Sequence, residues 1–520
     1  MRLLWLLLLP GLLHGQFDVL ITHGRIVDGT GNPWFYGDVG IRGDSIAAIG
    51  KLDGATARET LDARGKVVAP GFIDIHSHGR RGIFDVPTAE NYLREGVTTF
   101  IEGPDGSSPI PLAPFFAKLS ATPISVNVAS FVGHGAIRTE VMGLVNRKST
   151  PQEMEKMKDI ARQAMLDGAV GLSTGLFYVP GNYADTGEVI EIAKVVGALG
   201  GFHESHMRDE TDHILDSVRE TIRIGEEGGL PTQVTHHKVI GKANWGQSVA
   251  TLKLVEEARA RGVDVTIDQY PYTASSTGIA ALFPQWSQAG GRTALIERLD
   301  APASRDKIRN EIIGNIREGR GGGDPKNIVI VSCPFDAALA GKSLADLTMA
   351  RGVAVTIESA ADTAIALQRK GACSAVYHAI GEEDIERIMR SPYTMVASDG
   401  DIPLFGKAAP HPRSYGTFAR VLGVYVRERH VLTLEEAVRK MSGMPAARLK
   451  FGDRGILRPG MKADVVVFDA ATVADKSTFD QPHQYSVGFE DVLVNGKLVV
   501  KAGKVTAERP GRVLYGPGKK

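Results

Sequence analysis

The sequence predicts an α/β fold: a TIM-like (β/α)8 barrel joined to a small β-sandwich domain formed by both chain termini. Over residues 67–448, short apolar segments alternate with amphipathic segments of helical period, whereas both ends of the chain carry strand patterns. In addition, polar residues follow several of the predicted strands directly, at the end where barrels carry their active sites.

Strand patterns occupy both ends of the chain. From residue 17 to about residue 61, apolar and polar residues alternate between turns rich in glycine, asparagine and proline. The pattern returns at residues 464–469, 492–500 and 503–505, where Asn495-Gly496 predicts a hairpin turn. Because the middle of the chain differs, we expect residues 17–66 and 449–516 to form one β-sandwich domain.

Eight short apolar segments are the predicted barrel strands: residues 67–75, 98–101, 124–128, 170–173, 201–203, 232–235, 263–267 and 394–397. Helical patterns lie between many of them. One helix is predicted to begin at Thr150, where Thr-Pro-Gln-Glu forms a capping box with proline at the first helical position. Thr433 repeats the capping signal. Eight strands with intervening helices predict a closed barrel.

The interval between the seventh and eighth predicted strands is too long for one crossover. Residues 279–391 contain a glycine-rich loop at 320–325 and an extra strand pattern at 328–331. We interpret this interval as an insertion placed to cover the active site.

Composition and the amino terminus limit the cellular setting. Lys plus Arg and Asp plus Glu both number 60, so charge gives no reason to expect nucleic acid or an acidic membrane as partner. Residues 1–16 have the features of a signal peptide, with Arg2 before a short apolar run that Pro10 interrupts. That run is too short to span a bilayer, and no later segment approaches the required length. We expect an exported protein, periplasmic or secreted.

The two cysteines, Cys333 and Cys373, do not form a disulfide framework and have no metal-type spacing. Export would permit them to pair. We nevertheless expect two buried thiols.

Imidazole and carboxylate side chains stand at the ends of the predicted strands. His76 and His78 close the first strand, and their two-residue spacing puts both imidazoles on one face, toward the barrel mouth. His206 follows the fifth strand, His236 ends the sixth and Asp399 ends the eighth. Because the carboxyl ends of barrel strands meet at one face, we expect these side chains to converge.

The converging side chains form a ligand set for a metal ion. Imidazole and carboxylate ligands suit Zn²⁺, which makes water acidic enough to attack near neutral pH. We therefore predict a zinc site. Asp399 is assigned two roles, as a metal ligand and as the catalytic residue that accepts a proton and passes it to the leaving amine.

These residues lie in stretches that resemble a known family. The stretches are residues 70–78, 171–176, 206–210, 236–238, 270–277, 398–400 and 411–418, with later ones at 453–455, 463–469 and 482–485. Over residues 17–516 the sequence resembles the D-aminoacylase (N-acyl-D-amino-acid deacylase) family of the metal-dependent amidohydrolase superfamily. The resemblance implies a tight zinc ion at His206 and His236, and a weaker or absent second metal near His76, His78 and Asp399.

The resemblance also implies three substrate-binding residues, Lys238, Tyr272 and Arg413. Their chemistry agrees, because an arginine offers a fork of donors to a carboxylate and a tyrosine hydroxyl can polarise a carbonyl. Each also has an ordinary structural alternative: rim packing for Tyr270 and Tyr272, an ion pair for Arg413 and a solvated surface position for Lys238.

One position departs from the family pattern. The family has a metal-ligating cysteine after the second strand, and here that position falls on Asp105. A carboxylate can replace a bridging thiolate, although it is a harder ligand and binds zinc less tightly. Glu102 is a second candidate, because alternation with Thr98 would also point it inward. The fourth strand contains no lysine, which excludes a carbamylated-lysine bridge.

Together these features predict hydrolysis of the linear amide of N-acyl-D-amino acids to a carboxylate and a free D-amino acid. The expected partner is therefore a small molecule. One alternative is an amidohydrolase acting on a cyclic amide or a dipeptide. A second alternative is a non-catalytic barrel scaffold, against which the joint presence of five ligand-type side chains argues.

Overall fold

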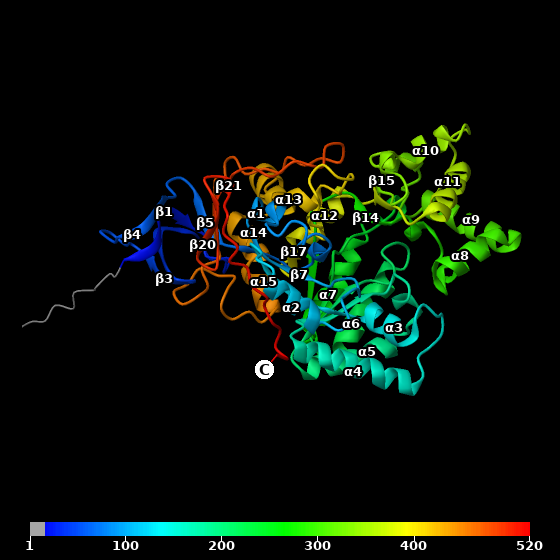
Figure 1. Ribbon diagram of the computed structural model, residues 1–520, viewed down its shortest axis with the longest axis horizontal. Helices are drawn as coiled ribbons and strands as arrows, with labels where there is room; N and C mark the ends of the chain where they lie inside the picture. The colour runs from blue at the N-terminus through cyan, green and yellow to red at the C-terminus, as the bar shows by residue number, and fades with distance from the viewer. Residues whose placement is uncertain (1–15, 520) are drawn as a thin grey trace, which may run out of the picture.

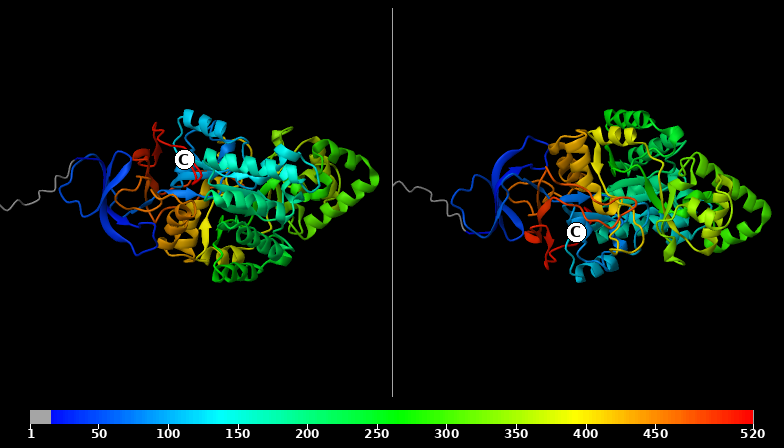
Figure 2. Two further views of the ribbon diagram at one scale, coloured as in Figure 1. Left: turned by 90° about the horizontal axis from the view of Figure 1, so that it is seen from below. Right: turned by 90° about the horizontal axis from the view of Figure 1, so that it is seen from above.

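The computed structural model describes residues 16–519, so the predicted signal peptide at 1–16 lies outside the described residues apart from Gln16. The molecule is elongated, with a β domain at one end, the barrel in the middle and the insertion at the other end (Figures 1 and 2). No helix within residues 16–519 is long and apolar enough to cross a membrane.

Strands from both ends of the chain form one nine-stranded sheet, as the alternating patterns predict. Its strands are β1 (Phe17–Ile26), β2 (Phe35–Arg42), β3 (Ser45–Gly50), β4 (Ala57–Asp62), β5 (Val67–Pro70), β18 (Val465–Phe468), β19 (Phe489–Val494), β20 (Lys497–Lys501) and β21 (Lys504–Val505). Val39 and Ile41 from one end and Val465 and Leu493 from the other share a single hydrophobic core. The two ends therefore fold as one domain.

The prediction of one barrel strand over residues 67–75 is wrong. β5 pairs with β1 and β18 in the β domain, and only β6 (Phe72–Asp74) belongs to the barrel. Gly71 lies between the two strands, where the side chain of Thr98 leaves no room for a Cβ atom. A continuous apolar run indicates a buried strand, but it does not indicate which sheet buries it.

Eight parallel strands form the barrel. They are β6, β7 (Val97–Glu102), a third strand made of β8 (Asn127–Ser130) and β9 (Val132–Gly133), β10 (Gly171–Gly175), β11 (Phe202–His206), β12 (Thr232–Val234), β13 (Val265–Gln269) and β17 (Thr394–Val396). The barrel closes where the Asp399 amide donates to the His76 carbonyl at 2.9 Å and the His78 amide donates to Gly400 at 2.8 Å. The predicted fold is confirmed.

Helices cover the outside of the barrel. They are α1 (Glu90–Leu93), α2 (Ala113–Ala121), α3 (His134–Met142), α4 (Pro151–Asp167), α5 (Thr186–Ala198), α6 (Ile214–Gly228), α7 (Ser248–Ala260), α12 (Glu382–Arg390), α13 (Arg413–Arg420), α14 (Leu434–Met441) and α15 (Gly443–Arg448). The α4 helix begins with the predicted capping box, in which Thr150 and Glu153 cap each other's backbone. Its Met157 and Met165 side chains are buried against the barrel.

The insertion is a separate layer with its own core. It consists of an antiparallel sheet of β14 (Ser275–Gly278), β16 (Ser374–Tyr377) and β15 (Ile328–Ser332), together with helices α8 (Gly291–Asp300), α9 (Pro302–Arg317), α10 (Leu344–Ala350) and α11 (Ile357–Lys370). The expected extra strand is β15. Ile385 and Met389 of α12 belong to the barrel's core, so the inserted layer ends near β16.

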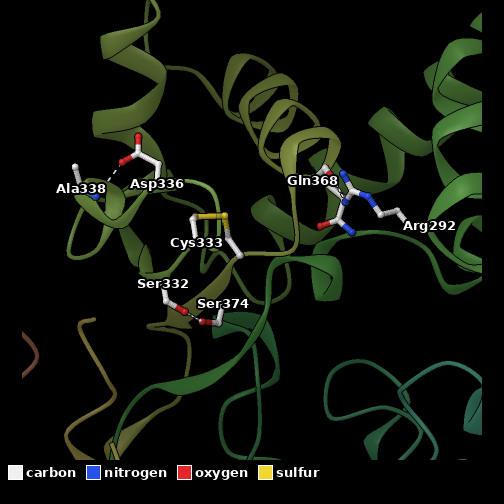
Figure 3. The surroundings of a disulfide bond; sticks show 8 residues. Arg292, Ser332, Cys333, Asp336, Ala338, Gln368 and Ser374 are labelled. Carbon is white, nitrogen blue, oxygen red and sulfur yellow. Dashed lines mark hydrogen bonds between the residues drawn. A yellow bond between two sulfur atoms is a disulfide. The ribbon is translucent and has the colours of Figure 1, made fainter. Parts of the chain in front are cut away.

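The expectation of two buried thiols is wrong, because Cys333 and Cys373 form a disulfide (Figure 3). β15 and β16 are antiparallel, and Ser332 is in register with Ser374. The cysteines are the next pair along these strands, which brings them together. This register was not visible in the sequence, where the cysteines are separated by 40 positions.

Candidate metal centre and active site

The six predicted metal ligands lie at the carboxyl ends of barrel strands, at the same end of the barrel. His76 and His78 follow β6, Asp105 follows β7, His206 ends β11, His236 follows β12 and Asp399 follows β17. Three of them have a left-handed backbone, with φ of 55° at Asp105, 34° at His236 and 51° at Asp399. Such a conformation costs about 1–3 kcal/mol for a residue other than glycine and is common at functional sites.

Four of these side chains form a first group around His76 and His78. His78 Nε2 lies 3.1 Å from Asp399 Oδ1 and 3.4 Å from Asp105 Oδ2. His76 Nε2 lies 3.5 Å from Asp399 Oδ1 and 3.6 Å from Asp105 Oδ1. The four ligand atoms lie within 4.8 Å of one another, which is close enough to surround one cation.

Asp105, His206 and His236 form a second group. His236 Nε2 lies 3.3 Å from Asp105 Oδ1, His206 Nδ1 lies 3.5 Å from the same oxygen, and the two nitrogens are 2.7 Å apart. Because Asp105 belongs to both groups, its carboxylate stands where a bridge between two metal sites would stand.

The surrounding residues fix the orientation of the imidazoles. His76 Nδ1 contacts Thr235 Oγ1 at 2.9 Å and Glu204 Oε2 at 3.3 Å, which turns Nε2 toward the centre. His236 Nδ1 contacts Lys238 Nζ at 2.6 Å, which turns its Nε2 the same way. Metal-binding histidines are typically held by such outer partners. His76 Nε2 is buried without a hydrogen-bond partner within the described part of the chain, as expected of a nitrogen placed to bind a metal.

The charge states of His206 and Asp399 also suit a cation. Burial lowers the pKa of His206 to about 4, so its imidazole is neutral at pH 7 and keeps a lone pair for a metal. Burial opposes ionisation of Asp399, but Arg413 and the two neighbouring imidazoles hold the pKa of this carboxyl well below its usual range. Asp399 is therefore ionised at neutral pH and able to accept a proton.

A cavity of about 470 Å³ opens over these residues. Its wall includes the predicted residues Lys238 and Arg413, together with Tyr270. Arg413 Nη1 donates to Asp399 Oδ2 at 2.7 Å, so this arginine directly contacts the residue that is predicted to accept the proton. Residues of the insertion, including Ser374 and Val331, also line the cavity.

Comparison with known proteins identifies the family. The Amidohydrolase family profile matches residues 59–500. The D-aminoacylase of Alcaligenes xylosoxydans xylosoxydans is 38% identical over 96% of this chain and 97% of that protein. The N-acyl-D-glutamate deacylase of the same organism is also 38% identical, over 96% of each chain. The chain belongs to the D-aminoacylase family of amidohydrolases.

A solved member of the D-aminoacylase family has the same architecture. The crystal structure of the N-acyl-D-glutamate deacylase from Bordetella bronchiseptica contains zinc and a phosphonate inhibitor that mimics the tetrahedral intermediate of the reaction. It matches this structure with a TM-score of 0.83 at 37% identity, over 96% of this chain and all of that one. The predicted family and fold are therefore confirmed.

The structure separates the two candidates for the ligand after β7. Asp105 contacts imidazoles in both groups, whereas Glu102 forms an ion pair with Arg80 and belongs to neither group. Alternation along the strand made Glu102 a candidate. Strand alternation does not extend to Asp105, because β7 ends at Glu102. Asp105 lies in the turn that follows and has a positive φ.

Tyr272, which is predicted to bind the substrate, lies outside the cavity. It is not on the cavity wall, and its hydroxyl faces the carbonyl of Pro412 at 3.5 Å. Tyr270 occupies the wall instead, with a buried hydroxyl that has no partner among the described residues. Burial raises the pKa of Tyr270 well above its usual value, so this hydroxyl keeps its proton and can donate a hydrogen bond.

Glu210 is a site residue that the sequence reasoning did not single out. It is buried, its Oε1 binds Lys238 Nζ at 2.5 Å, and it lies 3.3 Å from His236 Nδ1. Glu210 thereby orients one predicted metal ligand and neutralises one predicted substrate-binding residue. Its place four positions after His206 was the available signal, because a carboxylate near a ligand histidine is a frequent outer partner.

Proposed function

We propose that this chain is a zinc-dependent hydrolase that cleaves the linear amide of N-acyl-D-amino acids, releasing a carboxylate and a free D-amino acid. One observation carries the proposal: a buried, ionised Asp399 lies beside a cluster of imidazole and carboxylate ligands on the wall of a cavity. The similarity to D-aminoacylase and N-acyl-D-glutamate deacylase over nearly the whole chain supports it.

The residues present fit zinc, since structural and catalytic zinc sites use imidazole and carboxylate ligands. We propose a tight site at Asp105, His206 and His236, and a weaker second site at Asp105, His76, His78 and Asp399. Bound zinc supplies Lewis acidity, which polarises a carbonyl oxygen and makes water acidic enough to attack at neutral pH.

The protein's own groups supply the rest of the reaction. Asp399 accepts the proton of the attacking water and gives it to the leaving nitrogen. Lys238 and Arg413 face the substrate's α-carboxylate, and Arg413 also fixes the Asp399 carboxylate at 2.7 Å. The Tyr270 hydroxyl donates to a substrate oxygen, and its fixed position costs no reorganisation during the reaction.

A panel of chiral substrates tests the proposed function. N-acetyl-D-amino acids are expected to be hydrolysed with kcat/KM at least about 100-fold above their L-enantiomers, because inverting the α-carbon moves the amide or the carboxylate away from its partners. Cyclic imides and dipeptides are included as rival substrates. Equal rates on the enantiomers, or a preference for a cyclic imide, would contradict the proposal.

We also propose that the mature protein is exported. The signal features of residues 1–16 support this location, and so does the disulfide between Cys333 and Cys373, since disulfides persist in oxidising compartments. Mass measurement of the amino terminus of protein recovered from the periplasm or medium tests it, and an uncleaved, cytoplasmic chain would contradict it.

A further inference from the structure

Arg320 is a buried cation that the proposed reaction does not use. It precedes three glycines in the loop that follows α9, and it lines the active-site cavity with only 6% of its surface exposed. The glycines are needed to bring it there. A Cβ atom on Gly321 would collide with the carbonyl of Ile316, and Gly322 has a φ of +56°.

Arg320 is the least compensated of the three buried cations on the cavity wall. Lys238 has a close ion pair with Glu210, and Arg413 has one with Asp399 at 2.7 Å. Arg320 Nη2 reaches Glu210 only at 3.3 Å, and the same carboxylate already binds Lys238.

The remaining donors of Arg320 are available to a ligand. A guanidinium carries five N–H donors, and the contact with Glu210 is its one side-chain hydrogen bond within residues 16–519. Its carbon Cζ lies over the ring of Phe177, 4.5 Å from the centroid, which holds the group in place without occupying those donors. A buried charge with unused donors favours an anionic partner.

Arg320 lies close to the metal centre. Glu210 Oε2 is 3.3 Å from Arg320 Nη2 and 3.7 Å from His206 Nε2, so the width of one carboxylate separates the guanidinium from a predicted metal ligand. The side chain of a bound amino acid is long enough to span this distance. Besides Arg320, the insertion lines the cavity with one aliphatic side chain, Val331, and otherwise with small or hydroxyl-bearing residues: Ser275, Ser276, Thr277, Gly278 and Ser374. Hydroxyl groups suit a charged or polar ligand and offer little apolar surface to an aliphatic one.

We propose that Arg320 is a specificity-determining residue that binds the side-chain carboxylate of N-acylated acidic D-amino acids. Lys238 and Arg413 then serve the α-carboxylate, and the insertion presents Arg320 to the second carboxylate. This inference rests on the proposed function and narrows it to substrates with two carboxylates. The fork of the guanidinium can bind a carboxylate with two parallel hydrogen bonds.

Steady-state kinetics with the purified, zinc-loaded enzyme tests this inference. The substrates are N-acetyl-D-glutamate, N-acetyl-D-aspartate, N-acetyl-D-alanine and N-acetyl-D-leucine. The wild type is expected to prefer the two acidic substrates. Arg320→Met is expected to lower kcat/KM for them by about 10- to 100-fold, the effect of losing hydrogen bonds to a charged group, and to leave the neutral substrates nearly unchanged. Arg320→Lys keeps the charge but loses the two parallel hydrogen bonds. Its kcat/KM for the acidic substrates is expected to lie between those of the wild type and Arg320→Met.

Arg81→Met is the matched control. Arg81 lines the same cavity but is mostly exposed and paired with Asp401 at 3.2 Å, so its loss is expected to leave the acidic preference intact. An equal loss of preference in Arg81→Met would overturn the inference, because general electrostatics would then explain it. A wild type that hydrolyses D-substrates without preferring the acidic ones would also overturn it. So would an Arg320→Lys variant whose kcat/KM falls equally for all four substrates. A wild type inactive on all four would instead refute the proposed function itself.

Discussion

Replacing Asp399 by asparagine is expected to lower kcat for an N-acetyl-D-amino acid by about 10³-fold, within the range typical of a lost general acid–base group. The amide keeps nearly the same shape, so the cavity is preserved, but it cannot accept the proton of the attacking water. Zinc at the Asp105, His206 and His236 group is expected to remain, because Asp399 is not part of that group. Kinetics combined with elemental analysis of the same sample measures both effects.

Asp401→Asn is the control for this substitution. Asp401 also lines the cavity, but it pairs with the exposed Arg81 and contacts no imidazole of either group. It is expected to keep near wild-type activity. An Asp399→Asn enzyme with full activity would remove Asp399 from the proposed mechanism, whatever its metal content.

Replacing Asp105 by alanine is expected to weaken zinc binding by at least about 100-fold, since removing groups that only orient metal ligands already costs 10- to 100-fold. Both ligand groups lose their shared carboxylate, so activity is expected to fall with the metal content. Zinc bound per chain after dialysis against a chelator is the measurement. Asp105→Cys, which introduces the ligand typical of the family, is expected to bind zinc again.

Glu102→Gln is the matched control for Asp105. Glu102 is a buried carboxylate at the end of the same strand, but it pairs with Arg80 and belongs to neither ligand group. Its substitution is expected to leave the zinc content per folded chain unchanged. Loss of zinc in Glu102→Gln together with retention in Asp105→Ala would show that the bridging position was assigned to the wrong residue.

The ligand cluster was predictable because barrel geometry brings strand ends together. Once eight strands are placed, His76, His206, His236 and Asp399 must lie at one face, whatever their distance in sequence. The prediction depends only on which residues follow each strand, so errors of up to about five residues in the strand bounds did not affect it. The fold was predictable because strand and helix periods alternate along the chain.

The features that were missed depend on where the chain leaves regular structure. Tyr270 and Tyr272 follow β13, which ends at Gln269, so strand alternation could not decide which tyrosine enters the cavity. Arg320 lies in a glycine-rich loop with no period to indicate its direction. The pairing of Cys333 with Cys373 depends on the register of β15 and β16, and tertiary contacts set that register.

Anomalous diffraction at the zinc edge, from crystals of active enzyme, tests the metal centre most directly. The expected result is a peak about 2.0–2.2 Å from a nitrogen of His206, a nitrogen of His236 and an oxygen of Asp105. A fully active crystal with no peak among these three side chains, or with its zinc bound elsewhere, would contradict the account.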